Sequence, residues 1–502
     1  MRSQTLISLA ALCALLATPM ALAQRGVPAA DFDALADIGG RVERIKQYDD
    51  GPDGINAVIA YSYTAAFKAR DAIGVGILKG RSVLVKDNIE TEEWPTTAGS
   101  LALAENFTRR DAPLVANLRR NGGVVLGKTN LSEWANIRSN NSTSGWSAVG
   151  GLTRNPHAID RNACGSSSGS GAAIAAGMAW GAIGTETNGS ITCPASVNGI
   201  VGFKPSVGIV SRTHVVPISA SQDTAGPMTR TVYDAALLLS AIAGEDAADP
   251  ATLEARRVAD YTQGIETASL EGVRIGVLRG QIGPREDVRA LFEAALADME
   301  RAGAVLVDVD YETPGEFWGS TLPVLLYELR TGMDAYLAGL PGENGPRSLA
   351  DVVTFNRAEP TRELRWFGQD LFERALETTD AEAYEGHLAK IRRMTREEGI
   401  DRLLEKHDVR FLVAPTTGPA WSIDLVNGDN YSGGIGAGYL AAIAGYPHLT
   451  VPMGAVERLP VGLSIMGARW ADHDVLKAGA AYEKARTAVL PTPSFKRWMP
   501  EK

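Results

Sequence analysis

Three stretches of this sequence combine residue types that can carry out chemistry. Residues 122–129 match the phosphate-loop pattern G-x-x-x-x-G-K-[ST], which would bind a nucleotide. Residues 165–169 match the G-x-S-x-G elbow, which would present a serine nucleophile to an ester. The third set places Lys86 at the end of an apolar run and Ser166 and Ser190 in glycine-rich segments, and it could supply a nucleophile and its base.

The surroundings of the first two matches argue against both functions. A phosphate loop follows a strand, whereas residues 124–126 inside this match are Val, Val and Leu and indicate the strand itself. A nucleophile elbow must cap an apolar strand, but residues 155–163 before the motif are polar and include a proline. Ser/Gly runs also occur as flexible connectors. We therefore expect neither nucleotide binding nor an elbow nucleophile at Ser167.

The third set resembles the amidase signature family. The resemblance rests on Lys86 after an apolar strand, on the serine-rich residues 165–171 and on residues 184–195 with their tight turn before Ser190. It continues through residues 127–130, 202–205 and 222–228 and extends from about residue 55 to about residue 488. Because residues 127–130 are a common stretch of that family, the resemblance also accounts for the phosphate-loop match.

The resemblance implies a Ser-cisSer-Lys triad and no metal or other cofactor. Ser190 would be the nucleophile, Ser166 the bridging serine after a cis peptide bond, and Lys86 the proton acceptor. The spacing between the two serines is the one found in the family. The oxyanion hole would consist of the backbone N–H groups of Thr187, Asn188, Gly189 and Ser190.

Three positions near the nucleophile depart from the family pattern. Glu186 stands where the family usually has Asp, Asn188 where it has Gly, and Thr192 where many members have Arg. Because asparagine tolerates a positive φ better than most residues, we expect the turn to survive. Thr192 lacks the charge with which an arginine would recognise a substrate carboxylate.

Lysine is the base that this set of residues requires. A serine hydroxyl needs a base to take its proton, and His157 and His214 lie outside the motifs. The pKa of Lys86 must then fall by roughly three from about 10.4, which burial can achieve when no carboxylate is close. The apolar residues 83–85 favour such burial, and Asp87 should point to the opposite face of the strand.

Within the family, this chain resembles the bacterial peptide amidase branch. The resemblance rests on the sequence of residues 184–194, on the N-terminal segment and on residues 139–146. This implies an amide hydrolase that releases ammonia from carboxamides, with the C-terminal amides of peptides as expected substrates. The alternatives are an amidase for fatty-acid or aryl amides, a protein like the catalytic component of an aminoacyl-tRNA amidotransferase, and an exported binding protein without catalysis.

The N-terminus predicts export. An apolar run at residues 6–17 and the small-x-small triplet 21–23 are typical of a signal peptide over residues 1–23, leaving residues 24–502 as a single amidase domain, periplasmic or secreted. No later apolar stretch is long enough to span a bilayer. Cleavage would leave Cys164 and Cys193, close to the two serines, which could form a disulfide or pack as small apolar residues.

Composition limits the partners. The 49 Lys and Arg against 59 Asp and Glu give a net charge of −10 without a basic tract, which argues against nucleic acid. The three cysteines are too few for a disulfide scaffold, and no Cys-x-x-Cys or His-Glu-x-x-His pattern predicts a metal site. The expected partner is a small-molecule or peptide amide, and the oligomeric state is not indicated.

Alternating strand-like and helix-like segments predict an α/β fold, and the resemblance implies a central twisted mixed β-sheet with helices on both faces. The signature core would span about residues 70–245 and the remainder about 260–490, with a seam between two lobes at 244–260. We expect strands at 82–85, 124–126, 273–278, 305–309, 411–414, 448–452 and 459–465. Helices are expected at 111–121, 169–180, 285–302 and 472–488, and a mostly helical cover or lid at 323–407.

Overall fold

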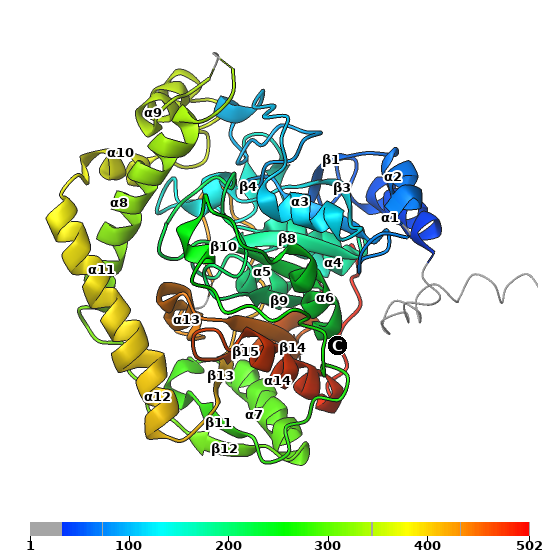
Figure 1. Cartoon of the computed structure of the whole chain (residues 1–502), viewed down its shortest axis with the longest axis vertical. Coiled ribbons are helices and arrows are strands. Elements are labelled where there is room, and N and C mark those ends of the chain that lie inside the picture. The colour runs from blue at the N-terminus through cyan, green and yellow to red at the C-terminus, as the bar shows by residue number, and fades with distance from the viewer. Residues whose placement is uncertain (1–32, 73, 343–344, 432, 501–502) are drawn as a thin grey trace, which may run out of the picture. The chain divides into compact units, whose positions relative to one another are not determined.

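An 11-stranded mixed β-sheet runs through the computed structural model, which describes residues 33–72, 74–342, 345–431 and 433–500 (Figure 1). Its strands, in spatial order, are β1 (Val58–Tyr61), β3 (Val124–Thr129), β2 (Ser82–Lys86), β8 (Gly181–Glu186), β10 (Thr224–Thr229), β9 (Val201–Lys204), β14 (His448–Val456), β15 (Leu459–Met466), β13 (Phe411–Pro415), β11 (Arg274–Val277) and β12 (Val305–Asp308). The seven strands expected from the sequence are all present, and the predicted signal peptide lies outside the described residues.

Helices cover both faces of this sheet, as expected for the α/β fold. One face packs against α3 (Pro113–Arg120), α6 (Val232–Ile242), α7 (Glu286–Arg301) and α14 (Asp472–Ala485). The other carries α4 (Ser168–Ala176), α5 (Thr192–Val197) and α13 (Gly438–Ala444). Because strand side chains alternate between faces, Val83 and Val85 enter the first layer and Lys86 points to the second.

A long helical segment lies along one side of the molecule, as predicted for residues 323–407 (Figure 1). It contains α8 (Phe317–Ala338), α9 (Leu349–Ala358), α10 (Asp370–Glu377), α11 (Ala381–Thr395) and α12 (Asp401–Lys406). Apolar side chains of α8, α9 and α10 form a separate core, in which Phe372 meets Trp134 edge to face. A lid function for this segment stays a prediction.

Smaller elements complete the described chain. The helices α1 (Ala34–Tyr48) and α2 (Ala65–Ala72) precede and flank β1 and were not expected. Two short hairpins join β4 (Trp146–Ser147) to β5 (Gly151–Leu152) and β6 (Arg154–Asn155) to β7 (Ala158–Asn162). Among the helices of the described residues, none is long and apolar enough to cross a membrane.

Two expectations about elements were wrong. The helix expected at 169–180 ends at Ala176, because Gly177 adopts a left-handed φ of 78° and caps it. Residues 244–260 do not form a seam between lobes: the described chain from Ala34 on is one compact unit. The sheet is continuous past this segment, since β9 pairs with β14, and Asp249 of the segment is buried against Arg212.

Candidate active site

Lys86 lies at the end of β2, fully buried, and donates to three acceptors. Its Nζ is 2.8 Å from Ser166 Oγ, 2.8 Å from Thr185 Oγ1 and 3.3 Å from the Thr185 carbonyl oxygen. Thr185 is within reach because β2 and β8 are parallel neighbours. A neutral lysine amine can give its two protons to Thr185 and direct its lone pair at Ser166, which is the arrangement a base requires.

Burial without an ion pair sets the protonation of this lysine. Removal of Lys86 from water lowers its pKa to about 7, against the opposing charges of Asp223 and Glu186. The neighbouring Asp87 points the other way, as expected, and its carboxylate lies 3.1 Å from Nζ of the buried Lys128. Lys86 is therefore available in its neutral form near pH 7.

Ser166 and Ser190 lie on adjoining segments. The peptide bond from Gly165 to Ser166 is cis, and Ser166 is fully buried against Lys86. The next residue, Ser167, donates its backbone N–H to the Ser190 carbonyl oxygen at 3.1 Å. Ser190 itself is partly exposed, and in the described part of the chain its hydroxyl makes no hydrogen bond. The structure thus joins Lys86 to Ser166 directly and brings Ser190 alongside through the backbone.

The turn that carries Ser190 is anchored at both ends. At one end Thr187 Oγ1 donates to Asp223 at 2.6 Å. At the other, Glu186 Oε2 accepts from the backbone N–H groups of Ile191 and Thr192 at 2.9 and 3.0 Å. Glu186, which departs from the family's Asp, therefore closes the turn and caps the start of α5.

The conformational reason we expected for this turn was wrong in one detail. The left-handed φ, 83°, falls on Gly189, whereas Asn188 has no positive φ and is exposed. An asparagine at 188 thus needs no special backbone tolerance, and glycine is required one residue later.

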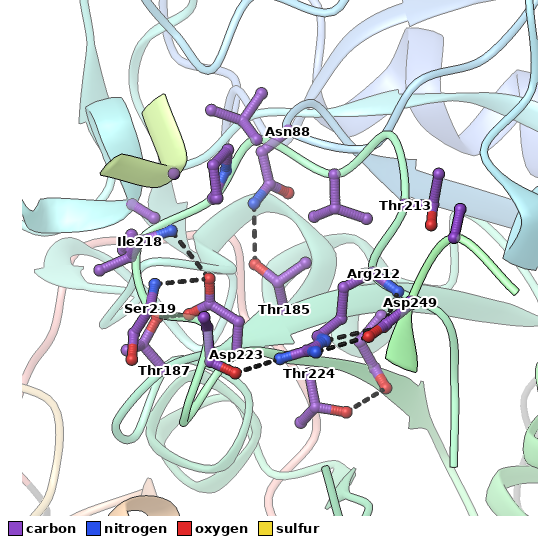
Figure 2. Close-up of a pocket in the computed structure, with 18 of the residues that line it drawn as sticks. Asn88, Thr185, Thr187, Arg212, Thr213, Ile218, Ser219, Asp223, Thr224 and Asp249 are labelled. Carbon is purple, nitrogen blue, oxygen red and sulfur yellow. Dashed lines mark hydrogen bonds and ion pairs between the residues drawn. The ribbon is translucent and has the colours of Figure 1, made fainter. Parts of the chain in front are cut away.

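A cavity of about 280 Å³ adjoins this turn (Figure 2). Thr185 and Thr187 line it next to the lysine and the turn, and Val215 and Ile218 contribute apolar wall. Asn88 also lines it and donates from Nδ2 to Thr185 Oγ1 at 3.0 Å. Of these residues the sequence singled out only Thr187 for a role, and the cavity itself was not foreseen.

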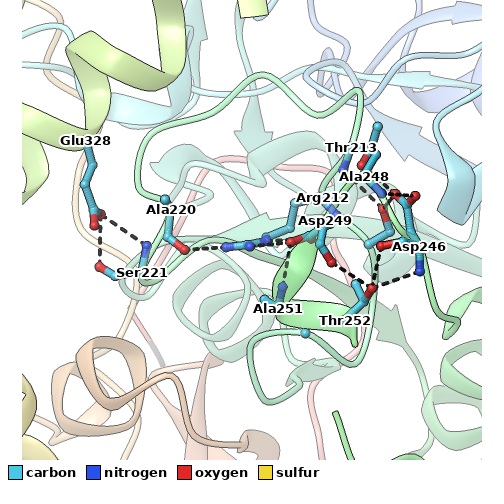
Figure 3. A network of polar contacts seen from close by, with 12 residues as sticks. Arg212, Thr213, Ala220, Ser221, Asp246, Ala248, Asp249, Ala251, Thr252 and Glu328 are labelled. Carbon is cyan, nitrogen blue, oxygen red and sulfur yellow. Dashed lines mark hydrogen bonds and ion pairs between the residues drawn. The ribbon is translucent and has the colours of Figure 1, made fainter. Parts of the chain in front are cut away.

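The charged groups of the cavity wall are already paired (Figures 2 and 3). Arg212 donates from Nε and Nη2 to the two oxygens of Asp249, at 2.8 and 2.6 Å. Asp223 accepts from Thr187 Oγ1 and from the backbone N–H groups of Ile218 and Ser219, the latter two at 2.8 Å. Burial raises the pKa of Asp223 above its ordinary value.

The side chains of the two rejected motifs make buried contacts within the fold. Lys128 lies within β3, fully buried, and donates to the Ile89 carbonyl at 2.8 Å. Ser167 is fully buried and donates from Oγ to the Thr185 carbonyl at 3.0 Å. Among the described residues there is also no group of three or more His, Cys, Asp or Glu side chains that could hold a metal ion.

The two cysteines left open by the sequence form a disulfide. Cys164 and Cys193 are bonded, with Cα atoms 6.0 Å apart. Cys164 precedes the cis peptide by one residue, and Cys193 lies in the first turn of α5, directly after the nucleophile turn.

The fold and the residues of this site can now be compared with known protein families. A sequence model described as Amidase matches residues 41–476 of the chain. The chain therefore belongs to the amidase family, with the amidase-signature α/β fold, and it is an amide hydrolase.

The chain is similar to a peptide amidase, to a probable amidase and to an amidotransferase component. The native peptide amidase from Stenotrophomonas maltophilia has a TM-score of 0.87 and 44% identity, covering 93% of this chain and 96% of that one. A probable amidase from Arabidopsis thaliana is 37% identical over 433 residues, 84% of this chain and 79% of the plant protein. One component of the glutamyl-tRNA(Gln) amidotransferase from Symbiobacterium thermophilum is 35% identical over 423 residues, 82% of this chain and 83% of that protein.

Proposed function

We propose that this protein hydrolyses the C-terminal carboxamide of peptides and releases ammonia, with Ser190, Ser166 and Lys86 as its catalytic triad. The observation that carries the proposal is the fully buried Lys86. Its Nζ is hydrogen-bonded to Ser166 Oγ at 2.8 Å, and its pKa is lowered to about 7. The likeness to a peptide amidase over nearly the whole chain supports the substrate class.

In the proposed reaction Ser190 Oγ attacks the carboxamide carbon and forms a C–O bond. Its proton passes to Ser166, and the Ser166 proton passes to the neutral amine of Lys86. The carbonyl oxygen becomes an oxyanion that accepts hydrogen bonds from backbone N–H groups of residues 187–190. The proton then returns through Ser166 to the nitrogen, the C–N bond breaks, and ammonia leaves an acyl-enzyme on Ser190.

Hydrolysis of the acyl-enzyme repeats the relay with water as nucleophile. Water attacks the ester carbon, and its proton passes through Ser166 to Lys86. The bond to Ser190 Oγ then breaks, and the serine recovers a proton from the same relay. The products are a carboxylic acid, which passes its proton to ammonia or to water, and ammonia, and the triad returns to its starting protonation.

The charges of the cavity favour an uncharged acyl group. Among the described residues that line the cavity, Arg212 is the one cationic side chain. Arg212 forms a two-point ion pair with Asp249. The cavity thus offers no free cation for a substrate carboxylate, and Thr192 offers none beside the nucleophile. A blocked or extended peptide amide meets this requirement better than free glutamine, the ammonia source of an amidotransferase.

The test is ammonia release from an N-blocked peptide amide, with Lys86→Ala and Ser190→Ala assayed beside the parent. We expect release by the parent alone, with internal peptide bonds intact by mass spectrometry. Parallel assays use a fatty-acid amide, an aryl amide and free glutamine. Turnover of any of these three substrates without turnover of the peptide amide would overturn the peptide-amide proposal.

We also propose that the protein is exported after cleavage behind Ala23. The apolar residues 6–17 and the triplet 21–23 support this. Mass spectrometry of the protein produced from the full sequence would then find Gln24 at the N-terminus in the exported fraction. A cell-retained protein that begins at Met1 would contradict the proposal.

A further inference from the structure

The disulfide lies between the two segments whose relative position the triad depends on. Cys164 stands two residues before Ser166, and Cys193 stands three residues after Ser190. Cys164 is nearly buried, at 5% exposure, and packs in an apolar cluster with Val197 and Trp421. The bond therefore joins the chain just before Ser166 to the chain just after Ser190.

Besides the disulfide, hydrogen bonds link the two segments: Ser167 Oγ donates to the Thr185 carbonyl at 3.0 Å and accepts from the Thr185 N–H at 3.2 Å. The Ser166 hydroxyl is bonded to Lys86, while the Ser190 hydroxyl makes no hydrogen bond in the described chain. Between the adjoining segments the backbone contributes one hydrogen bond, from Ser167 N–H to the Ser190 carbonyl at 3.1 Å. Ala163, just before the disulfide, accepts from Asn198 Nδ2 at 3.0 Å, beyond the end of α5.

The backbone at Cys164 adds a second observation. Its φ of 56° is left-handed, a conformation that is unfavourable for a non-glycine residue and persists where neighbours enforce it. Asn162 Oδ1 accepts from the Cys164 N–H at 2.7 Å, so the cysteine is held from its backbone as well as its sulfur. Because Cys164 directly precedes the Gly165–Ser166 peptide bond, a fixed backbone at Cys164 constrains the position of Ser166.

We propose that Cys164 and Cys193 are positioning residues for the amidase reaction: their disulfide holds Ser190 in register with Ser166. The proposal rests on the proposed triad but not on the peptide-amide substrate. A disulfide that only stabilises the fold acts mainly through the unfolded chain. Such a disulfide would change the melting temperature and leave the turnover of folded enzyme unchanged, so the two roles are separable.

The first experiment reduces the folded enzyme. A water-soluble phosphine supplies two electrons to the S–S bond, two protons convert the sulfurs to thiols, and the phosphine becomes its oxide with oxygen from water. Circular dichroism at 25 °C verifies that the protein stays folded, and thiol titration before and after the treatment verifies that two further thiols are freed. We expect kcat to fall roughly 10- to 100-fold with KM within about twofold, because small misplacements of catalytic groups have effects of this size. Reoxidation should restore kcat.

The second experiment removes the cross-link without the strain. In the pair Cys164→Gly with Cys193→Ala, glycine adopts the left-handed φ at 164 at no steric cost, so this variant is suited to fold without the bond. We expect the same loss of kcat and no response to the phosphine. The matched pair Cys164→Ala with Cys193→Ala keeps the strained backbone and should melt at a lower temperature.

The readout is chosen to be independent of the natural substrate. A p-nitrophenyl ester and covalent labelling of Ser190 by a sulfonyl fluoride both report on the nucleophile and its base. If the parent reacts with these probes but releases no ammonia from peptide amides, the proposed substrate fails and the disulfide test still stands. If reduced, folded enzyme or the glycine variant keeps kcat within twofold and only melts earlier, the positioning role is overturned.

Discussion

Lys86, the proposed base, should determine the pH dependence of this enzyme. The lysine acts as a base only when neutral, and burial lowers its pKa to about 7. As pH rises through that value the neutral fraction grows, so kcat/KM should rise about tenfold per pH unit below 7 and level off above about 8. A pH series of kcat/KM on a carboxamide tests this. A profile still rising steeply at pH 10 would show that the lysine keeps its ordinary pKa.

Asp223 should tune the same lysine. Its charge opposes the lowering of the Lys86 pKa, and Asp223→Asn removes that charge while an amide oxygen can still accept from Thr187. The pKa of Lys86 should then fall further, and the acid limb of kcat/KM should move to lower pH. Glu186→Gln, which removes the second opposing charge, should move the limb in the same direction. An unmoved limb in both variants would contradict this electrostatic account.

The catalytic candidates were accessible to sequence reasoning, but their surroundings were not. Lys86, Ser166 and Ser190 stand in motifs that can be read along the chain. Thr185, by contrast, reaches Lys86 because Val85 pairs with Ile183 across neighbouring strands. Asp223 likewise meets Thr187 because Thr224 pairs with Glu186 across the antiparallel strands β10 and β8. Such partners follow from the pairing of strands, which no local pattern encodes.

At the scale of elements, Glu328 joins α8 to the loop that walls the cavity (Figure 3). Its buried carboxylate accepts from the hydroxyls of Ser219 and Ser221, from the Ser221 N–H at 3.2 Å and from Tyr384 of α11 at 2.8 Å. Glu328→Ala leaves the buried Ser221 N–H without its acceptor, which should cost about 1–3 kcal/mol of unfolding free energy. The loosened wall should also raise KM.

Urea unfolding and steady-state kinetics measure these two effects. Tyr384→Phe is the matched control, because it removes the outermost of the same hydrogen bonds and leaves the loop contacts of Glu328 in place. We expect a smaller stability loss and an unchanged KM. Equal effects in both variants would show that Glu328 does not hold the loop.

Some strands of the sheet can be predicted from their sequence and others cannot. The strand at 82–86 is a run of β-branched and apolar residues and was expected, whereas β8 and β10 are rich in Gly, Ala and Thr and were not. Their glycines have a packing reason: a Cβ at Gly184 would lie 2.8 Å from Met228 Sδ and from Ser167 Oγ. Because β8 and β10 pack closely around the site, they contain small residues in place of the β-branched and large apolar residues by which a strand is predicted.

At the scale of the whole molecule, one buried network ties the helical segment 317–406 to the sheet domain. Arg138, fully buried, pairs with Glu133 and with Glu363, and it donates to the carbonyls of Phe367 and Gly368 at 3.2 Å each. Arg138→Ala leaves two buried carboxylates without their cation. Breaking a buried pair in this way typically costs about 3–5 kcal/mol.

Thermal and urea unfolding measure that loss. The exposed pair Arg357–Glu373 is the control, since Arg357→Ala removes a solvated pair that should contribute about 0–1 kcal/mol. Similar melting temperatures for the two variants would show that the network around Arg138 does not hold the segment in place.

The order of strands in the sheet also bears on how the chain can be synthesised. The six neighbours from β1 to β9 all come from the first 229 residues, but the partner of β9 on its other side, β14, begins only at His448. A growing chain therefore completes the half-sheet with the proposed catalytic residues long before that open edge is paired. Unpaired edges recruit other chains. A fragment of residues 24–245 should accordingly aggregate although it carries the whole proposed triad. A chaperone that delays folding until release should improve the yield of the full protein.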